Sequence, residues 1–151
     1  MKRGLNSAII IILIGGAILA AGWFLIKKTA PKESEIISQK GIHWHAQLII
    51  KIFGQRQEIP ALVGLAKGEK PIHTHEADGV IHLEFNGLVK KEDIKLGRFF
   101  EIWDKKFSRD CIFDKCSGAA GQLKMLVNGQ PNSEFENYPM RDGDKIEITF
   151  E

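Results

Sequence analysis

Residues 43–53 read HWHAQLIIKIF, and the apolar residue at every second position determines the fold that the sequence predicts. Successive side chains of a β-strand point to opposite faces of a sheet. One alternate set begins with His43 and His45, whereas the other is wholly apolar and consists of Trp44, Ala46, Leu48, Ile50 and Ile52. We therefore expect a strand whose apolar side chains enter the core and whose histidines lie on the opposite face.

A second strand is predicted at residues 80–86, VIHLEFN, by the same alternation. Ile81, Leu83 and Phe85 fall on one face, and His82 and Glu84 fall on the other. Two strands, considered independently, thus place their histidines away from the apolar face.

All five histidines lie within this part of the chain: His43, His45, His73, His75 and His82. Imidazole is the commonest protein ligand for zinc and copper, and two His-x-His pairs with a fifth histidine indicate a metal site. No methionine flanks the histidines, which favours divalent copper or zinc over copper(I). Asp78 and Glu84 are expected to orient the ligands. Histidines that cluster by chance on a polar surface are the alternative.

Residues 61–79 show no strand pattern and form a long predicted loop that carries His73 and His75. A loop of this length in a compact domain is usually functional or disordered. Helical spacing then follows at residues 94–107, where one apolar stripe contains Leu96, Phe99, Phe100, Trp103 and Phe107. We expect this helix to cover the apolar face of the sheet.

Cys111 and Cys116 are spaced C-x4-C, which favours a small disulfide loop formed in an oxidising compartment. The alternatives are a redox-active pair, thiolate ligands for copper(I) or zinc, and a reduced inert pair.

Residues 7–26 hold no charge, and about twenty apolar residues are enough to span a bilayer as a helix. We expect a basic tail at 1–6, a transmembrane anchor at 7–26, a linker at 27–41 and a domain at 42–151. A cleavable signal peptide is the rival interpretation. The lysines after the anchor favour a cytoplasmic domain, whereas the cysteine pair favours an extracytoplasmic one, and we expect the latter, in a single-pass membrane protein.

The formal net charge of +2 is concentrated at the N-terminus. Residues 1–31 hold four basic side chains and no acidic one, which leaves 17 basic and 19 acidic residues in the rest of the chain. A domain with this balance has no basic stripe for phosphates, so nucleic acid is not an expected partner.

Residues 127–150, VNGQPNSEFENYPMRDGDKIEITF, resemble the final third of β-grasp (ubiquitin-like) domains, notably of small sulfur-carrier proteins. Sulfur carriers end in Gly-Gly, whereas this chain ends in Phe150-Glu151, so conjugation does not carry over. The resemblance implies an α+β fold, a β-grasp-like mixed sheet with one packed helix. The long His-bearing insertion at 60–86 is foreign to the minimal fold, and the predicted transmembrane helix precedes the domain.

The portion after the predicted anchor also resembles a group of uncharacterised membrane-anchored microbial proteins. They share the motifs H-x-H, H-T-H-x-x-D-G-x-x-H and L-G-x-F-F-x-x-W, which here lie at 43–45, 73–82 and 96–103. The resemblance implies a common site without an activity.

Three classes of function stay open. The sequence favours a membrane-anchored metal-binding module for copper or zinc handling, without an assigned catalytic residue. A metalloenzyme with an open site of three histidines, and a metal-free module that binds a protein partner, are the alternatives.

Overall fold

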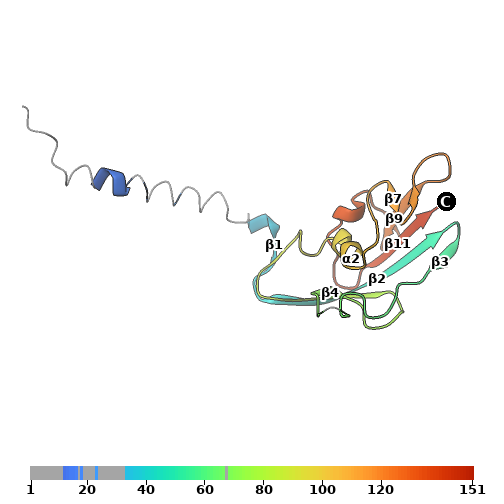
Figure 1. The fold of residues 1–151 in the computed structure, drawn as a ribbon, viewed down its shortest axis with the longest axis horizontal. Helices are drawn as coiled ribbons and strands as arrows, with labels where there is room; N and C mark the ends of the chain where they lie inside the picture. Colours follow the sequence, from blue (N-terminus) through green and yellow to red (C-terminus); the bar gives the residue numbers. More distant parts are fainter. Residues whose placement is uncertain (1–11, 17, 19–22, 24–32, 67) are drawn as a thin grey trace, which may run out of the picture. The chain divides into compact units, whose positions relative to one another are not determined.

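The computed structural model describes residues 12–16, 18, 23, 33–66 and 68–151 (Figure 1). Residues Glu35–Glu151 form one compact unit. Its main sheet has seven strands: β2 (Gly41–Ile52), β3 (Gln55–Gln57), β4 (Ile72–His73), β5 (Val80–Asn86), β9 (Leu123–Val127), β10 (Gln130–Pro131) and β11 (Lys145–Phe150). Two small sheets pair β1 (Ile36–Ser38) with β6 (Val89–Lys90), and β7 (Cys111–Ile112) with β8 (Lys115–Cys116). The helical elements are α2 (Leu96–Ile102) and the 3-10 turns η1 (Glu33–Glu35) and η2 (Phe135–Asn137).

Strand β2 is the centre of the main sheet, whose order is β10-β9-β11-β2-β5-β4. Residues 41–47 of β2 pair with β5 in antiparallel fashion, and residues 47–52 pair with β11 in parallel. Strand β3 returns from the turn after β2 and pairs with residues 50–52. The long strand therefore joins the His-bearing half of the sheet to the half formed by the end of the chain.

The core lies on the face that the alternation predicts. Ala46, Leu48 and Ile50 of β2 are buried, as are Ile81 and Leu83 of β5. They belong to one cluster with the buried side chains of α2, which are Leu96, Phe99 and Phe100. The predicted burial of these side chains is confirmed, and the alternate residues of both strands are left on the opposite face.

Glycine is required at the entry to β5. Gly79 has a φ of 84°, and a Cβ at this position would lie 2.6 Å from the carbonyl oxygen of Leu48. The backbone of the turn therefore lies directly against β2, where the N–H of Leu48 donates to the Gly79 carbonyl over 2.8 Å. This close approach fixes β5, and with it His82, against the central strand.

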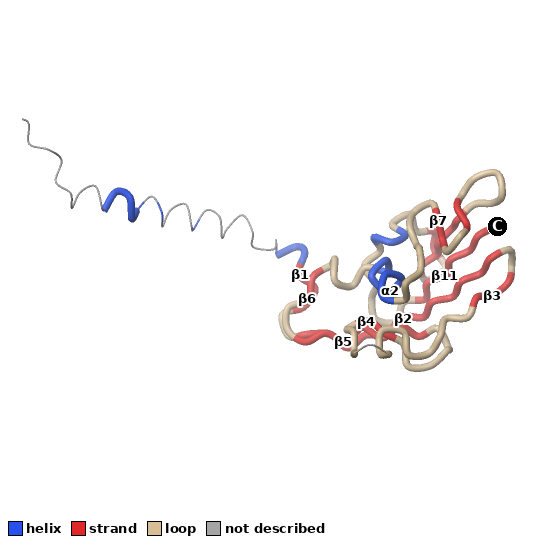
Figure 2. The backbone as a smooth tube through the Cα atoms, viewed as in Figure 1, coloured by secondary structure: helices blue, strands red, loops and turns tan. Residues whose placement is uncertain are grey.

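The predicted α+β class, a β-grasp-like sheet with a packed helix behind a transmembrane helix, is corrected. The described chain is mostly β-sheet, as Figure 2 shows, and among its residues only α2 reaches seven helical residues. The helix predicted at 94–107 ends early because Asp104 has a φ of 57°. Phe107 then pairs with Ile112 in an isolated bridge, although its ring still stacks on Phe100 with centroids 4.4 Å apart.

The predicted single-pass membrane location is also corrected. No helix in the described residues is long and apolar enough to cross a membrane. Of the predicted anchor, only residues 12–16, 18 and 23 are described, and they are helical. The rest of 7–26, the predicted basic tail and residues 27–32 of the linker lie outside the described residues. The last linker residues contribute β1, which belongs to the compact unit.

The predicted disulfide is confirmed, because Cys111 and Cys116 are bonded to each other. They are directly opposite residues of the β7–β8 hairpin, with Cα atoms 4.0 Å apart. Neither sulfur is a free thiolate, so the alternative of cysteine metal ligands is excluded.

Candidate metal centre

Three neighbouring strands bring three histidines into one row across the sheet. His45 of β2 lies directly opposite His82 of β5, and His73 of β4 lies opposite His82 on its other side. Directly opposite residues project from the same face, with their side chains in contact range. The row His45–His82–His73 therefore follows from the register of β2, β5 and β4.

The remaining polar side chains join this row through the two-residue period of the strands. His43 lies two residues before His45 and opposite Glu84, which is two residues after His82. His75 follows β4, and its ring centroid lies 4.5 Å from that of His82. All five histidines and one glutamate thus gather on a single face.

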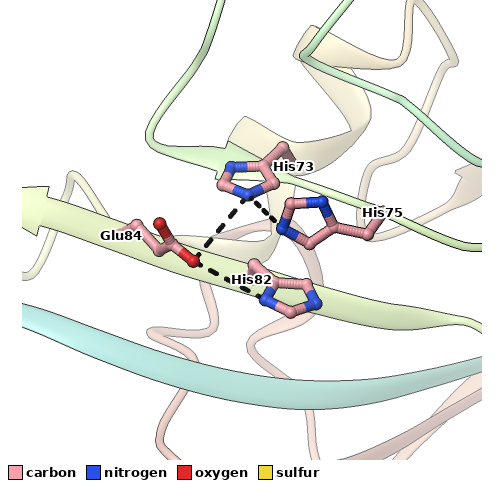
Figure 3. A group of neighbouring side chains, drawn as sticks. All are labelled: His73, His75, His82 and Glu84. Atoms are coloured by element: carbon pink, nitrogen blue, oxygen red, sulfur yellow. Dashed lines mark hydrogen bonds and ion pairs between the residues drawn. The ribbon is translucent and has the colours of Figure 1, made fainter.

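The side chains of His73, His75, His82 and Glu84 form what we call the inner group (Figure 3). Each offers one ligand atom, and these four atoms all lie within 4.8 Å of one another. Nε2 of His73 lies 3.2 Å from Nε2 of His75 and 4.0 Å from Oε1 of Glu84. The same glutamate oxygen lies 3.8 Å from Nδ1 of His82. This group can hold a metal ion.

His73 is held in a fixed orientation by the loop before it. The residue is buried, at 1% exposure, and its Nδ1 lies 2.9 Å from the carbonyl oxygen of Lys70. A carbonyl only accepts, so Nδ1 carries the proton of the neutral ring and Nε2 presents its lone pair to the inner group. A backbone carbonyl that orients a ring in this way is the usual partner of a metal-ligating histidine.

His82 is the central ring, and its Nδ1 is buried without a hydrogen-bond partner in the described part of the chain. Burial lowers the pKa of His82, and the neighbouring His75, His45 and His73 lower it further, against the opposite effect of Glu84. The neutral imidazole is therefore favoured, and a neutral ring has a lone pair free for a metal.

His43, His45 and His82 form a second set, which we call the outer group. Their ligand atoms again lie within 4.8 Å of one another, but His43 and His45 are exposed. The backbone of His45 is held by the loop before β11, because its N–H donates to Asp142 and its carbonyl accepts from Gly143. His82 is the member shared with the inner group.

The two acidic residues expected as ligand orienters differ in position. Glu84 lies among the histidines, with Oε1 also 3.5 Å from Nε2 of His43. Asp78 instead closes the turn into β5: its side chain accepts from the N–H of Val80, and its carbonyl accepts from the amide of Gln47.

Two residues that position the site, Lys70 and Thr74, were not predicted from the sequence. The carbonyl of Lys70 acts through the backbone, which every residue type shares. Thr74 is buried between the two loop histidines, and its hydroxyl donates to the carbonyl of Pro60. A polar residue between two histidines was the available signal for Thr74, but its partner lies fourteen residues away.

Comparisons of the chain with protein-family models, curated proteins and solved structures find no match. Function therefore has to be inferred from the two groups themselves.

Proposed function

We propose that this protein is a metal-binding module that holds a divalent zinc or copper ion in its inner group. The supporting observation is the convergence of three imidazoles and one carboxylate within 4.8 Å of one another, with one imidazole nitrogen buried and unpaired. An unpaired buried polar atom costs free energy unless something binds it. A metal ion at the centre of the group supplies that partner.

The separations in the inner group fit a small ion. Ligands at about 2.0–2.1 Å in a tetrahedron stand about 3.3 Å from one another. The His73 and His75 nitrogens, 3.2 Å apart, already meet this separation. Oε1 of Glu84 lies 3.8 Å from Nδ1 of His82 and 4.0 Å from Nε2 of His73. A shift of this carboxylate by about half an ångström brings both separations close to the tetrahedral value.

An ion-pair cluster of protonated histidines around Glu84 is the competing explanation of the same contacts. The contact of Glu84 with the central ring is an ion pair only if His82 is charged, and its pKa is lowered, chiefly by burial. Neutral rings around a carboxylate are what a divalent ion needs, because it binds the unprotonated imidazole.

The donor set narrows the choice of metal. Imidazole nitrogen and carboxylate oxygen suit zinc(II) and copper(II), whereas copper(I) prefers thiolates and thioethers. Both cysteines are bonded to each other, and Met125 and Met140 are buried in the core cluster. Four protein donors close a tetrahedral site, which is typical of binding rather than of catalysis.

The test is elemental analysis of the full-length chain, purified without a His-tag, together with calorimetric titration of zinc and copper into metal-free protein. We expect at least one ion per chain. His82→Ala should lower affinity by more than about 100-fold, beyond the loss that removal of an orienting partner causes. Gln47→Ala, on the same face of β2 as His45, should retain the metal affinity of the wild type.

Glu84→Gln and Glu147→Gln form a matched pair, because the two glutamates are 34% and 33% exposed. Only the first should weaken binding. A folded wild-type chain that takes up neither metal would overturn the proposed function.

A further inference from the structure

The disulfide of Cys111 and Cys116 takes no part in the two groups of metal ligands. It joins directly opposite residues of the β7–β8 hairpin, which is a sheet of its own. Ile112 of the same strand is buried in the core, and adjacent residues of a strand point to opposite faces. The disulfide therefore lies on the outward face of the hairpin, where Cys116 is exposed. A dissolved thiol can reach this sulfur.

The bond adds little to the stability of the hairpin. Its cysteines have a sequence separation of 5, and the stabilisation that closure gives falls as the loop shortens. Other contacts already fix the hairpin. The N–H of Ser117 donates to the carbonyl of Asp110 over 2.7 Å, and the N–H of Phe113 donates to the carbonyl of Lys106 over 2.8 Å. The ring of Phe113 also packs edge-on against Trp103, with centroids 5.6 Å apart. These contacts keep the two sulfurs opposite each other after the bond opens.

A cationic side chain lies beside the exposed sulfur. Nζ of Lys106 is 3.6 Å from Sγ of Cys116, and no carboxylate of the described chain forms an ion pair with this lysine. A disulfide sulfur is uncharged and accepts hydrogen bonds weakly, so the ammonium gains little from the bonded state. A thiolate carries a full negative charge, which an adjacent lysine stabilises. Lys106 therefore favours the opened pair and attracts an incoming thiolate.

We propose that Cys111 and Cys116 form an exchangeable disulfide that oxidises an external dithiol, with Lys106 stabilising the thiolate of Cys116. Exposed disulfides are the ones that exchange readily with dissolved thiols. This activity is separate from the proposed metal binding, because no residue of the hairpin belongs to the inner or the outer group.

The exchange takes place in two steps. One thiolate of the dithiol attacks Sγ of Cys116, the bond between the two protein sulfurs breaks, and its electron pair goes to Sγ of Cys111, which takes a proton from solvent. The second thiolate of the dithiol then attacks the dithiol's own bonded sulfur, which closes the dithiol's disulfide and releases Cys116 as a thiolate beside Lys106. The dithiol gives up two electrons and two protons. The protein gains both electrons and one proton, and the other proton stays in solvent.

Dithiothreitol is the dithiol that tests the exchange. Metal-free full-length protein is mixed with it in the presence of a metal chelator and without denaturant, and free thiols are counted over time by alkylation and mass spectrometry. We expect reduction with an unchanged circular dichroism spectrum, and reoxidation when oxidised glutathione replaces the dithiothreitol. In glutathione buffers poised as in a cytosol both forms should coexist, whereas a structural disulfide stays oxidised there.

Lys105 and Lys106 form a matched pair, because both are exposed and only Lys106 of the two lies beside a sulfur. Lys106→Gln should slow reduction by about fivefold, the effect of one charge at this distance in water, whereas Lys105→Gln should retain the wild-type rate. In the variant Cys111→Ser, alkylation of Cys116 should persist to lower pH than in Cys111→Ser/Lys106→Gln.

Three results would overturn the exchangeable disulfide and leave the proposed function intact. They are equal reduction rates in the two lysine variants, reduction only after urea unfolds the chain, and a pair that stays oxidised in every glutathione buffer. A wild-type chain that exchanges its disulfide but binds no zinc or copper would overturn the proposed function alone.

Discussion

At the scale of single residues, His82 affects both the stability of the fold and the candidate metal site. It lies between His45 and His73 in the row across the sheet, and its Nδ1 is buried without a partner in the described residues. The faces of His43, His45 and His82 could be predicted from alternation alone. The shared role of His82 could not, because it depends on which strands lie on either side of β5.

Because the His82 ring is buried, the stability of the fold should depend on pH. The pKa of His82 lies below its ordinary value of 6.5 in the folded chain, chiefly because burial disfavours the charged ring. Between the folded and the ordinary pKa the unfolded chain binds more protons, so the free energy of unfolding rises with pH in that window. We expect the urea midpoint of metal-free protein to fall as the pH drops below 6.5.

The control for this prediction is the exposed member of the cluster. His82→Gln should reduce the change of the urea midpoint with pH below 6.5. His43→Gln, which replaces a ring that is 66% exposed, should retain most of that change. A change that is the same in wild type and His82→Gln would contradict the assignment to His82.

At the scale of elements, the loop of residues 60–79 is held to the site by one buried threonine. The Thr74 hydroxyl donates to the carbonyl of Pro60 over 2.8 Å and accepts from the N–H of Val63 over 3.1 Å. The backbone of Thr74 also exchanges two hydrogen bonds with this segment, through Leu62 and Val63. His73 and His75 flank Thr74, so the same bonds position both imidazoles.

Thr74→Val keeps the shape of the side chain but leaves the carbonyl of Pro60 and the N–H of Val63 without the hydroxyl. Unpaired buried groups of this kind cost about 1–3 kcal/mol each. We expect the free energy of unfolding to fall by about 2 kcal/mol and metal affinity to fall with it, measured by urea denaturation and titration calorimetry. Thr149→Val on β11 is the control and should change both little. Unchanged metal affinity in a destabilised Thr74→Val would show that the loop does not position the ligands.

The sequence predicted some elements better than others for physical reasons. Strands β2 and β5 alternate over their whole length, and burial of one face makes that pattern reliable. The apolar stripe at 96–107 correctly marks residues that pack together, but the backbone turns out of the helix near Asp104. Strand β4 was missed because two residues give no period, and its existence depends on pairing with β5.

At the scale of the molecule, the order of the strands was beyond what the sequence shows. The alternation puts His45 and His82 on polar faces but does not say that β2 and β5 are neighbours or that these two residues are opposite. That register depends on pairings between residues far apart in the chain. The assembly of the row on one face is therefore a property of the whole sheet.

The disulfide offers a test of how far the site is independent of the rest of the fold. Closure of a loop this short stabilises a protein by about 2 kcal/mol. Cys111→Ser/Cys116→Ser should lower the free energy of unfolding by that amount. The number of bound ions, measured by elemental analysis, should not change, because β7 and β8 form a sheet of their own. A double variant that is folded but loses metal would show that the hairpin supports the site.

The position of the ligands along the chain has a consequence for biosynthesis. Every candidate donor lies between His43 and Glu84, on β2, β5 and β4 or directly after β4, whereas β11 pairs with β2 across almost a hundred residues. The segment with all the donors is translated before β9 and β11. The proposed ion would therefore have its full set of ligands, and could hold β2, β5 and β4 together, before the last strands are available to pair with β2.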